Sequence, residues 1–158
     1  MMRMNVLWAA VAAVVLCTSA QAAPKIDDPV IFVRWVYAEM ATDKNFAYPE
    51  DALSPRLKAL EDLDKREAGG EVGRLDFDFF ANAQDWSISD LSVTGAPVEN
   101  AKDREVVTAQ FKNGKRKNEI HFYFEKTAAG WKLDDARSVI GGSWTLSLIL
   151  KYGWDTPE

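Results

Sequence analysis

The chain has 158 residues, of which 27% are charged and 47% hydrophobic, and its formal net charge is −5 at pH 7. This composition is typical of one ordinary globular domain. An acidic surface repels the phosphate backbone, so the charge argues against a general nucleic-acid binder.

The first 22 residues are expected to form a secretory signal peptide. Arg3 supplies a positive start, Val6 to Leu16 form an apolar run, and Ala20 to Ala22 offer a small-residue cleavage site. No later run reaches the roughly 18 apolar residues that a membrane span needs. Cleavage after Ala22 therefore predicts a single periplasmic or secreted domain over residues 23–158, without a transmembrane anchor.

Cys17 lies inside this segment, and Leu16 before it disfavours a lipidated cysteine. The exported domain would then contain no cysteine, which removes disulfides and thiolate ligands together. His121 is the one histidine of the chain. Transition-metal sites of the usual nitrogen and sulfur type are thereby excluded, and we expect no cofactor.

A first helix is predicted to begin at Asp28-Pro29, a favourable N-cap followed by a favourable first position. Its apolar residues form two neighbouring stripes at helical spacing. These stripes contain Val30, Val33, Tyr37 and Met40, and Ile31, Trp35 and Ala38. So wide an apolar surface predicts a largely buried helix.

A second helix is predicted to begin at Ser54-Pro55 and to end at Gly69-Gly70. Leu57, Leu60 and Leu63 give it a narrow apolar stripe, and its other face is charged. We therefore expect this helix on the surface of the core.

From residue 87 the hydrophobic pattern has a period of two, which predicts β-strands. Four strands are expected, over residues 87–95, 104–111, 119–126 and 130–138. Leu91 and Val93 carry the alternation in the first of them, and Asn113-Gly114 is a strong hairpin signal between the second and third. A short apolar helix over residues 143–154 is expected to close an α+β domain, in which N-terminal helices pack on an antiparallel sheet.

The stretch Arg74–Trp86, RLDFDFFANAQDW, places carboxylates among aromatic rings. It fails as a calcium loop, because Phe80 stands where an oxygen ligand is needed and Ala81 replaces the glycine of the turn. A looser cation site through Asp76 and Asp78 stays open. We favour an anchored connection, in which the rings enter the core and the carboxylates face solvent or cap backbone amides.

Gln84, Asp85 and Trp86 stand at the entrance to the first strand. Their polar groups can pair with backbone groups that the loop leaves free, and this structural role is the interpretation that we favour. The alternative is a binding role at the mouth of a pocket.

His121 is a candidate for proton transfer at neutral pH. Alternation places it on the outer face of the third strand with Tyr123. Asp134 and Asp135 would point to opposite faces of a regular strand, so one of them is expected to turn inward or to lie at a strand end. An aspartate base with His121 or Tyr123 as hydrogen-bond donor would suit a small isomerase or hydrolase, provided that these groups converge in one closed pocket.

Lys115, Arg116 and Lys117 gather at the predicted hairpin tip. Such a tip suits an acidic partner or anionic lipid head groups. The alternative is that these charges only protect the strand ends from aggregation and bind no partner. No aromatic platform accompanies these cations, which argues against single-stranded nucleic acid.

The order of the segments FVRWVYAEM, LDFDFFANAQDW and GWKLDDARSVIGGSWTLSLIL resembles a family of exported bacterial proteins labelled domain of unknown function 3828. Its most specific markers here are Gln84-Asp85-Trp86 and residues 131–135, and the resemblance covers nearly all of residues 23–158. It implies a fold similar to nuclear transport factor 2, in which a curved sheet wraps around helices and leaves a pocket. It implies no activity and no catalytic residue.

These observations favour a non-enzymatic periplasmic binding or interaction protein that recognises another envelope or secreted protein. An immunity protein that neutralises a secreted toxin is a specific version of this hypothesis. The alternatives are the small pocket enzyme and a ligand-binding module without chemistry. The last of these would show an apolar pocket that lacks a convergent pair of titratable groups.

Overall fold

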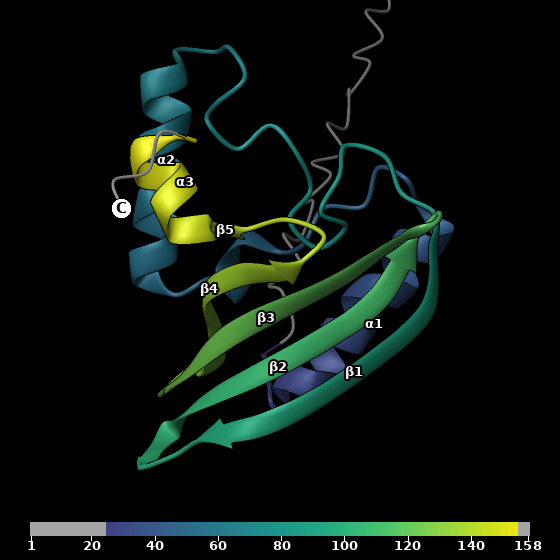
Figure 1. Ribbon diagram of the computed structural model, residues 1–158. Helices are drawn as coiled ribbons and strands as arrows, with labels where there is room; N and C mark the ends of the chain where they lie inside the picture. Colours follow the sequence, from purple (N-terminus) through teal and green to yellow (C-terminus); the bar gives the residue numbers. More distant parts are fainter. Residues whose placement is uncertain (1–24, 155–158) are drawn as a thin grey trace, which may run out of the picture.

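The computed structural model of the protein describes residues 25–154 (Figure 1). Its helices are α1 (Pro29–Thr42), the 3-10 helix η1 (Glu50–Ala52), α2 (Pro55–Ala68) and α3 (Leu146–Tyr152). Its strands are β1 (Ile88–Val98), β2 (Ala101–Asn113), β3 (Arg116–Thr127), β4 (Gly130–Ile140) and β5 (Trp144–Thr145). The predicted signal peptide lies outside the described residues, and within them no helix has the length and apolar character of a membrane span.

The five strands form one antiparallel sheet in the order β1-β2-β3-β4-β5. The predicted α+β class and the β2–β3 hairpin are confirmed. The sheet has one more strand than predicted, because Trp144 and Thr145 pair with the end of β4 before α3 begins. Helix α1 lies across one face of β1 and β2, whereas α2 and α3 lie side by side next to β4 (Figure 1).

Helix α1 begins as its sequence predicts. Asp28 Oδ1 accepts a hydrogen bond from the backbone N–H of Ile31 at 3.0 Å, and Pro29 is the first helical residue. The buried face differs from the prediction in part, because Phe32 and Val36 are buried and Ile31 is 64% exposed. The sheet covers α1 from one side, so only one of the two predicted stripes enters the core.

Helix α2 also has its predicted ends. Ser54 Oγ accepts a hydrogen bond from the Leu57 N–H at 3.1 Å, and Gly69 closes the helix in the left-handed conformation at φ 61°. Leu57 is fully buried, while Leu60 and Leu63 keep part of their surface in solvent. The prediction of a helix on the surface of the core is confirmed.

The β2–β3 turn lies one residue later than the Asn-Gly signal implies. Asn113 pairs with Arg116, so the two-residue loop consists of Gly114 and Lys115, with Gly114 at φ 59°. Glycine in the first loop position is the arrangement that a type II′ turn favours. Asn113 stays in β2, where its Oδ1 accepts a hydrogen bond from the Ser87 N–H at 2.8 Å.

The edge strand β1 departs from simple alternation. Its register against β2 shifts between Ser89 and Ser92, where Asp90 has a φ of 53°. The resulting bulge leaves Val93 buried and Leu91 40% exposed. Leu91 therefore does not join the core as its alternation with Val93 suggested.

The inner face of the sheet is filled with side chains. Val107, Ala109, Ile120 and Phe122 have no exposed surface, and the Phe80 ring stacks on Phe122 with centroids 4.7 Å apart. The pocket that the family resemblance implies is not open in this part of the described chain. The grooves that a ligand can reach lie on the surface.

Candidate binding site

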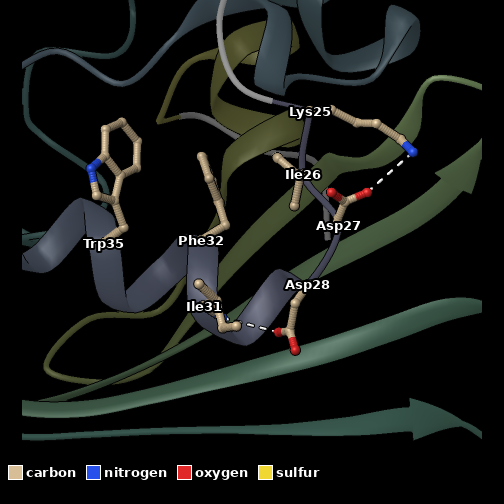
Figure 2. A pocket seen from close by; sticks show the side chains of 7 residues that line it. All are labelled: Lys25, Ile26, Asp27, Asp28, Ile31, Phe32 and Trp35. Atoms are coloured by element: carbon tan, nitrogen blue, oxygen red, sulfur yellow. Dashed lines mark hydrogen bonds and ion pairs between the residues drawn. The ribbon is translucent and has the colours of Figure 1, made fainter.

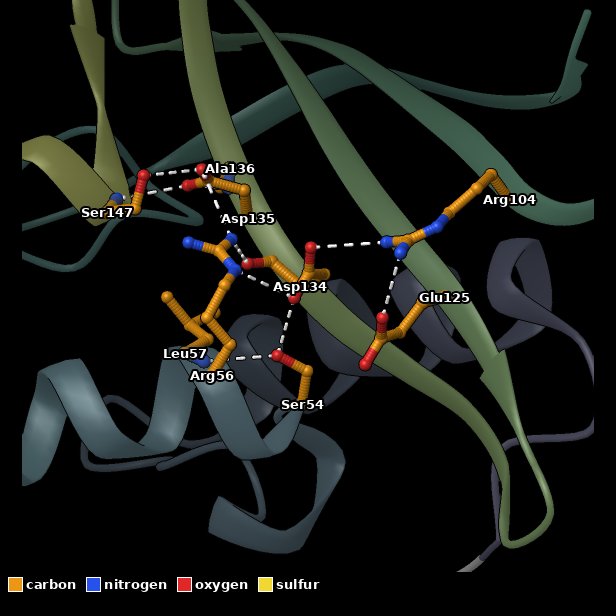
Figure 3. Close-up of polar contacts among 9 residues, drawn as sticks. All are labelled: Ser54, Arg56, Leu57, Arg104, Glu125, Asp134, Asp135, Ala136 and Ser147. Carbon is orange, nitrogen blue, oxygen red and sulfur yellow. Dashed lines mark hydrogen bonds and ion pairs between the residues drawn. The ribbon is translucent and has the colours of Figure 1, made fainter. Parts of the chain in front are cut away.

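Asp134 and Asp135 both lie on the outer face of the sheet (Figure 3). Tyr123 pairs with Asp135 and Phe124 pairs with Leu133, so Asp134 is an additional residue in β4. This β-bulge removes the alternation that a regular strand would impose. The expectation that one of the two aspartates turns inward or lies at a strand end is therefore wrong, since both lie within β4.

Asp134 connects β4 to α2 and to β2 (Figure 3). Its Oδ1 accepts hydrogen bonds from Ser54 Oγ at 2.6 Å and Arg56 Nε at 3.1 Å, and its Oδ2 accepts from Arg104 Nη1 at 3.3 Å. Arg104 also pairs with Glu125 at 3.1 Å. Burial raises the pKa of Asp134, but the hydrogen bonds from Ser54 and Arg56 and the two arginine charges outweigh it, so the pKa lies below its ordinary value.

Asp135 attaches the first turn of α3 to β4. Its Oδ1 accepts hydrogen bonds from the N–H groups of Ala136 at 2.9 Å and Ser147 at 3.0 Å. Its Oδ2 accepts from Ser147 Oγ at 2.5 Å and lies 3.6 Å from Arg56 Nη2. The carboxylate thus satisfies a backbone N–H that the start of a helix leaves without an intrahelical partner.

A surface groove of about 470 Å³ lies beside these carboxylates and is called the outer groove. It is lined by Arg56, Val98, Arg104, Glu105, Tyr123, Phe124, Asp134, Asp135, Arg137 and Thr145. The structure thus brings Tyr123 to the two aspartates but leaves His121 out, since His121 Nε2 lies 2.8 Å from Glu119 Oε1. Both carboxylates accept hydrogen bonds from neighbouring elements, Asp134 from α2 and β2 and Asp135 from α3.

Gln84, Asp85 and Trp86 join the entrance of β1 to its neighbours. Gln84 Nε2 donates to the Asp76 carbonyl at 3.2 Å, and the Asp85 carbonyl accepts from Asn113 Nδ2 at 3.1 Å. Trp86 Nε1 donates to the Met40 carbonyl at 3.0 Å, in the last turn of α1. These contacts fit the favoured structural role, and none of the three residues lines the outer groove.

Replacing Trp86 with phenylalanine is expected to lower the free energy of unfolding by about 1 kcal/mol, because the Met40 carbonyl loses its indole donor. Urea unfolding measures this loss, with the exposed Gln84→Ala as a control that should change stability by less than about 0.5 kcal/mol. A Trp86→Phe variant of unchanged stability and impaired binding would instead support a role at a pocket.

Asp78 caps a turn within the aromatic stretch. Its Oδ1 accepts hydrogen bonds from the N–H groups of Phe80 at 2.8 Å and Ala81 at 3.0 Å, while Phe79 and Phe80 are buried. Burial raises the pKa of Asp78, and the two N–H bonds oppose that rise. Asp76 is exposed, and among residues 25–154 no group of three His, Cys, Asp or Glu side chains is placed to hold a metal ion.

Lys115, Arg116 and Lys117 are exposed at the β2–β3 turn, which lies at the end of the sheet away from α2 and α3 (Figure 1). Lys112 nearby pairs with Asp90 at 2.7 Å. No ion pair of the described chain includes any of the three tip cations. Their charge is therefore available to a partner.

A second groove, called the helix groove, runs between α2 and α3 and has a volume of about 600 Å³. It is lined by Arg56, Ala59, Leu60, Leu63, Arg66, Ser147, Leu148, Lys151 and Tyr152. The lining includes two arginines and a lysine but no carboxylate. The helix groove thus combines apolar walls with positive charge on a protein whose net charge is −5.

The sequence analysis missed this groove, although α3 carries a signal for it. Leu146, Ile149 and Leu150 are buried, whereas Leu148 and Tyr152, four residues apart, are 40% and 44% exposed. Apolar side chains that gather on an exposed side of a helix are typical of a site that contacts a ligand or a partner.

A third groove, of about 390 Å³, lies at the start of α1 (Figure 2). It is lined by Lys25, Ile26, Asp27, Asp28, Ile31, Phe32 and Trp35. Asp28 caps the helix, and Lys25 pairs with Asp27 at 3.1 Å. This groove therefore offers an apolar wall whose charged neighbours are already engaged.

No protein-family model matches the chain, and no curated protein matches it. A solved structure of a phospholipid-binding protein from Ralstonia solanacearum, in complex with a phospholipid, is similar at 20% sequence identity with a TM-score of 0.31. The match covers 75% of this chain and 58% of that chain, so this chain spans less than two thirds of that protein. At this TM-score the likeness supports no conclusion about ligand or activity, and the relation to the exported family stays a prediction.

Proposed function

We propose that this protein is a non-enzymatic binding module that acts in the periplasm or outside the cell and holds its ligand in the helix groove. The predicted export signal and the resemblance to an exported bacterial family support the compartment. The helix groove supports the activity.

The observation that carries the proposal is an apolar surface beside cations that form no ion pair within the described residues. Leu148 and Tyr152 stay partly exposed next to Leu60 and Leu63. Lys151, at the same groove, forms no ion pair within residues 25–154. Contiguous exposed apolar surface with a few convergent polar groups is typical of a binding site.

The same groove offers little for catalysis. It contains no histidine and no carboxylate, and the carboxylates of Asp134 and Asp135 are engaged in the outer groove. An apolar site without a convergent titratable pair fits a ligand-binding module better than an isomerase or a hydrolase.

The hairpin tip supports a second candidate function. Lys115, Arg116 and Lys117 project from the end of the β2–β3 hairpin without an ion-pair partner in the described chain. A compact group of exposed cations attracts an acidic protein surface, as an immunity-type protein would need for a secreted toxin.

The experiment that tests both candidates is capture from an envelope extract with the immobilised chain of residues 23–158. The groove variant is Arg66→Glu with Lys151→Glu, and the tip variant, Lys115→Glu with Arg116→Glu, reverses the same number of charges. Proteins and lipids retained on each are identified by mass spectrometry.

Material retained by the parent chain and by the tip variant, but roughly tenfold less by the groove variant, is the expected result. Loss on the tip variant alone would support the second candidate in place of the first. Identical retention by all three chains would contradict both.

A further inference from the structure

We infer that the helix groove binds a single-chain amphiphilic anion, with the hydrocarbon chain along the groove and a carboxylate or phosphate head group at Arg66 and Lys151. This inference rests on the proposed function and names the chemical class of its ligand.

The walls of the groove suit one hydrocarbon chain. Arg56, Leu60, Leu63 and Arg66 follow one another along α2 at spacings of four, three and three residues, so they share one side of that helix. At a rise of 1.5 Å per residue, the two arginines are separated by about 15 Å along the helix. The volume of about 600 Å³ falls within the range of small-molecule sites.

The opposite wall comes from α3. Leu148 and Tyr152 lie four residues apart and therefore face the groove from the same side of that helix. Together with the leucines of α2 they line the open groove between two helices that lie side by side (Figure 1). A groove between two helices accepts one chain, whereas a bilayer needs apolar side chains that project from a convex face.

The positive charges at the groove favour an anionic ligand, and their distribution indicates at which end of the groove its head group binds. Arg56, at one end, is already paired with Asp134 at 3.1 Å and Asp135 at 3.6 Å. Arg66 and Lys151 form no ion pair within residues 25–154. The head group is therefore placed at the Arg66 and Lys151 end.

The described carboxylates nearest to Arg66 along α2 form their ion pairs with other cations. Asp62, four residues before Arg66, pairs with Lys58, and Glu67, the next residue, pairs with Arg74. The Lys151 ammonium lies 4.9 Å from the centroid of the Tyr152 ring, and both residues line the helix groove.

The test is calorimetric titration of the chain of residues 23–158 with three probes. Dodecanoate has the chain and the negative charge, dodecyltrimethylammonium has the same chain with a positive charge, and acetate has the charge without the chain. We expect binding of dodecanoate, with the other two weaker by roughly tenfold or more.

Two matched variants locate the site. Arg66→Gln with Lys151→Gln should weaken dodecanoate binding roughly tenfold, whereas Lys115→Gln with Arg116→Gln, which removes the same charge at the hairpin tip, should leave it unchanged. Leu148→Gln, at a partly exposed position, should weaken dodecanoate binding without impairing folding. Equal binding of dodecanoate and the cationic probe, or binding that the groove variants do not weaken, would overturn the inference.

Phosphatidylglycerol vesicles separate a single-chain amphiphile from a membrane surface. Dodecanoate binding without co-sedimentation supports the inference, whereas co-sedimentation that the groove variants weaken would show that the groove binds a two-chain lipid or a bilayer and would overturn it. If dodecanoate does not bind but the groove variant still loses a captured protein, the inference fails and the proposed function stands. If neither occurs, both fail.

Discussion

Replacing Asp134 with alanine is expected to lower the free energy of unfolding by about 3 kcal/mol at pH 7. The change removes the acceptor of Ser54 Oγ and separates Arg56 and Arg104 from their shared carboxylate. A hydrogen bond to a charged group contributes about 1.5–3 kcal/mol, and the solvent exposure of both arginines reduces their share. Urea unfolding followed by circular dichroism measures the loss.

The pH dependence provides a second measurement. The pKa of Asp134 is lowered in the folded protein, so the unfolded chain binds more protons at this position as the pH falls below the ordinary value of 3.8. The contribution of Asp134 is therefore fully present above that pH and is lost as the pH falls through the folded-state pKa. Between pH 5 and pH 2 the free energy of unfolding of the alanine variant should therefore fall less than that of the parent. Urea unfolding of both proteins at the two pH values measures the difference.

Asp90→Asn is the matched control for this prediction. Asp90 is an exposed carboxylate with a lysine partner at 2.7 Å, and asparagine tolerates its φ of 53°. Its loss should lower the free energy of unfolding much less than the loss of Asp134 does at pH 7, because solvent screens an exposed ion pair. Equal losses for Asp134→Ala and Asp90→Asn would contradict the role of Asp134 as the connection between β4, α2 and β2.

The helix ends and the meander could be predicted because their causes are local. Asp28 and Ser54 cap N–H groups three residues ahead, and Gly69 supplies the left-handed end of α2, so each signal lies within one turn of its effect. The choice between Ile31 and Phe32 as the buried residue depends on which side of α1 the sheet covers. That choice follows from packing between distant segments, which local spacing does not encode.

The candidate site was less predictable for the same reason. The bulge at Asp134 depends on the register between β3 and β4, and its residue types alone suggested two opposite faces. The helix groove depends on the packing of α2 against α3, whose sequences are separated by the whole sheet. Leu60 and Leu63 were correctly placed on an apolar stripe, but the stripe faces α3 and the groove as well as the core.

Replacing Asn82 with alanine is expected to lower the free energy of unfolding by about 3–4 kcal/mol. Asn82 is 8% exposed; its Oδ1 accepts from Trp144 Nε1 at 2.8 Å and its Nδ2 donates to Asn118 Oδ1 at 3.0 Å. Each buried group left without a partner costs about 1–3 kcal/mol. The φ of 52° adds about 1 kcal/mol, because alanine disfavours the left-handed region that asparagine tolerates.

Two further variants separate these contributions. Asn100→Ala removes an exposed asparagine at a φ of 62°, so it carries the conformational cost without the buried hydrogen bonds and should lose about 1 kcal/mol. Asn82→Gly relieves the conformational cost at position 82 and should remain about 2 kcal/mol less stable than the parent. If Asn82→Ala and Asn100→Ala lost the same amount, the buried bonds to Trp144 and Asn118 would contribute nothing. A larger loss at Asn82 would show that the stretch RLDFDFFANAQDW fixes the end of the sheet through its asparagine, by binding the indole that begins β5.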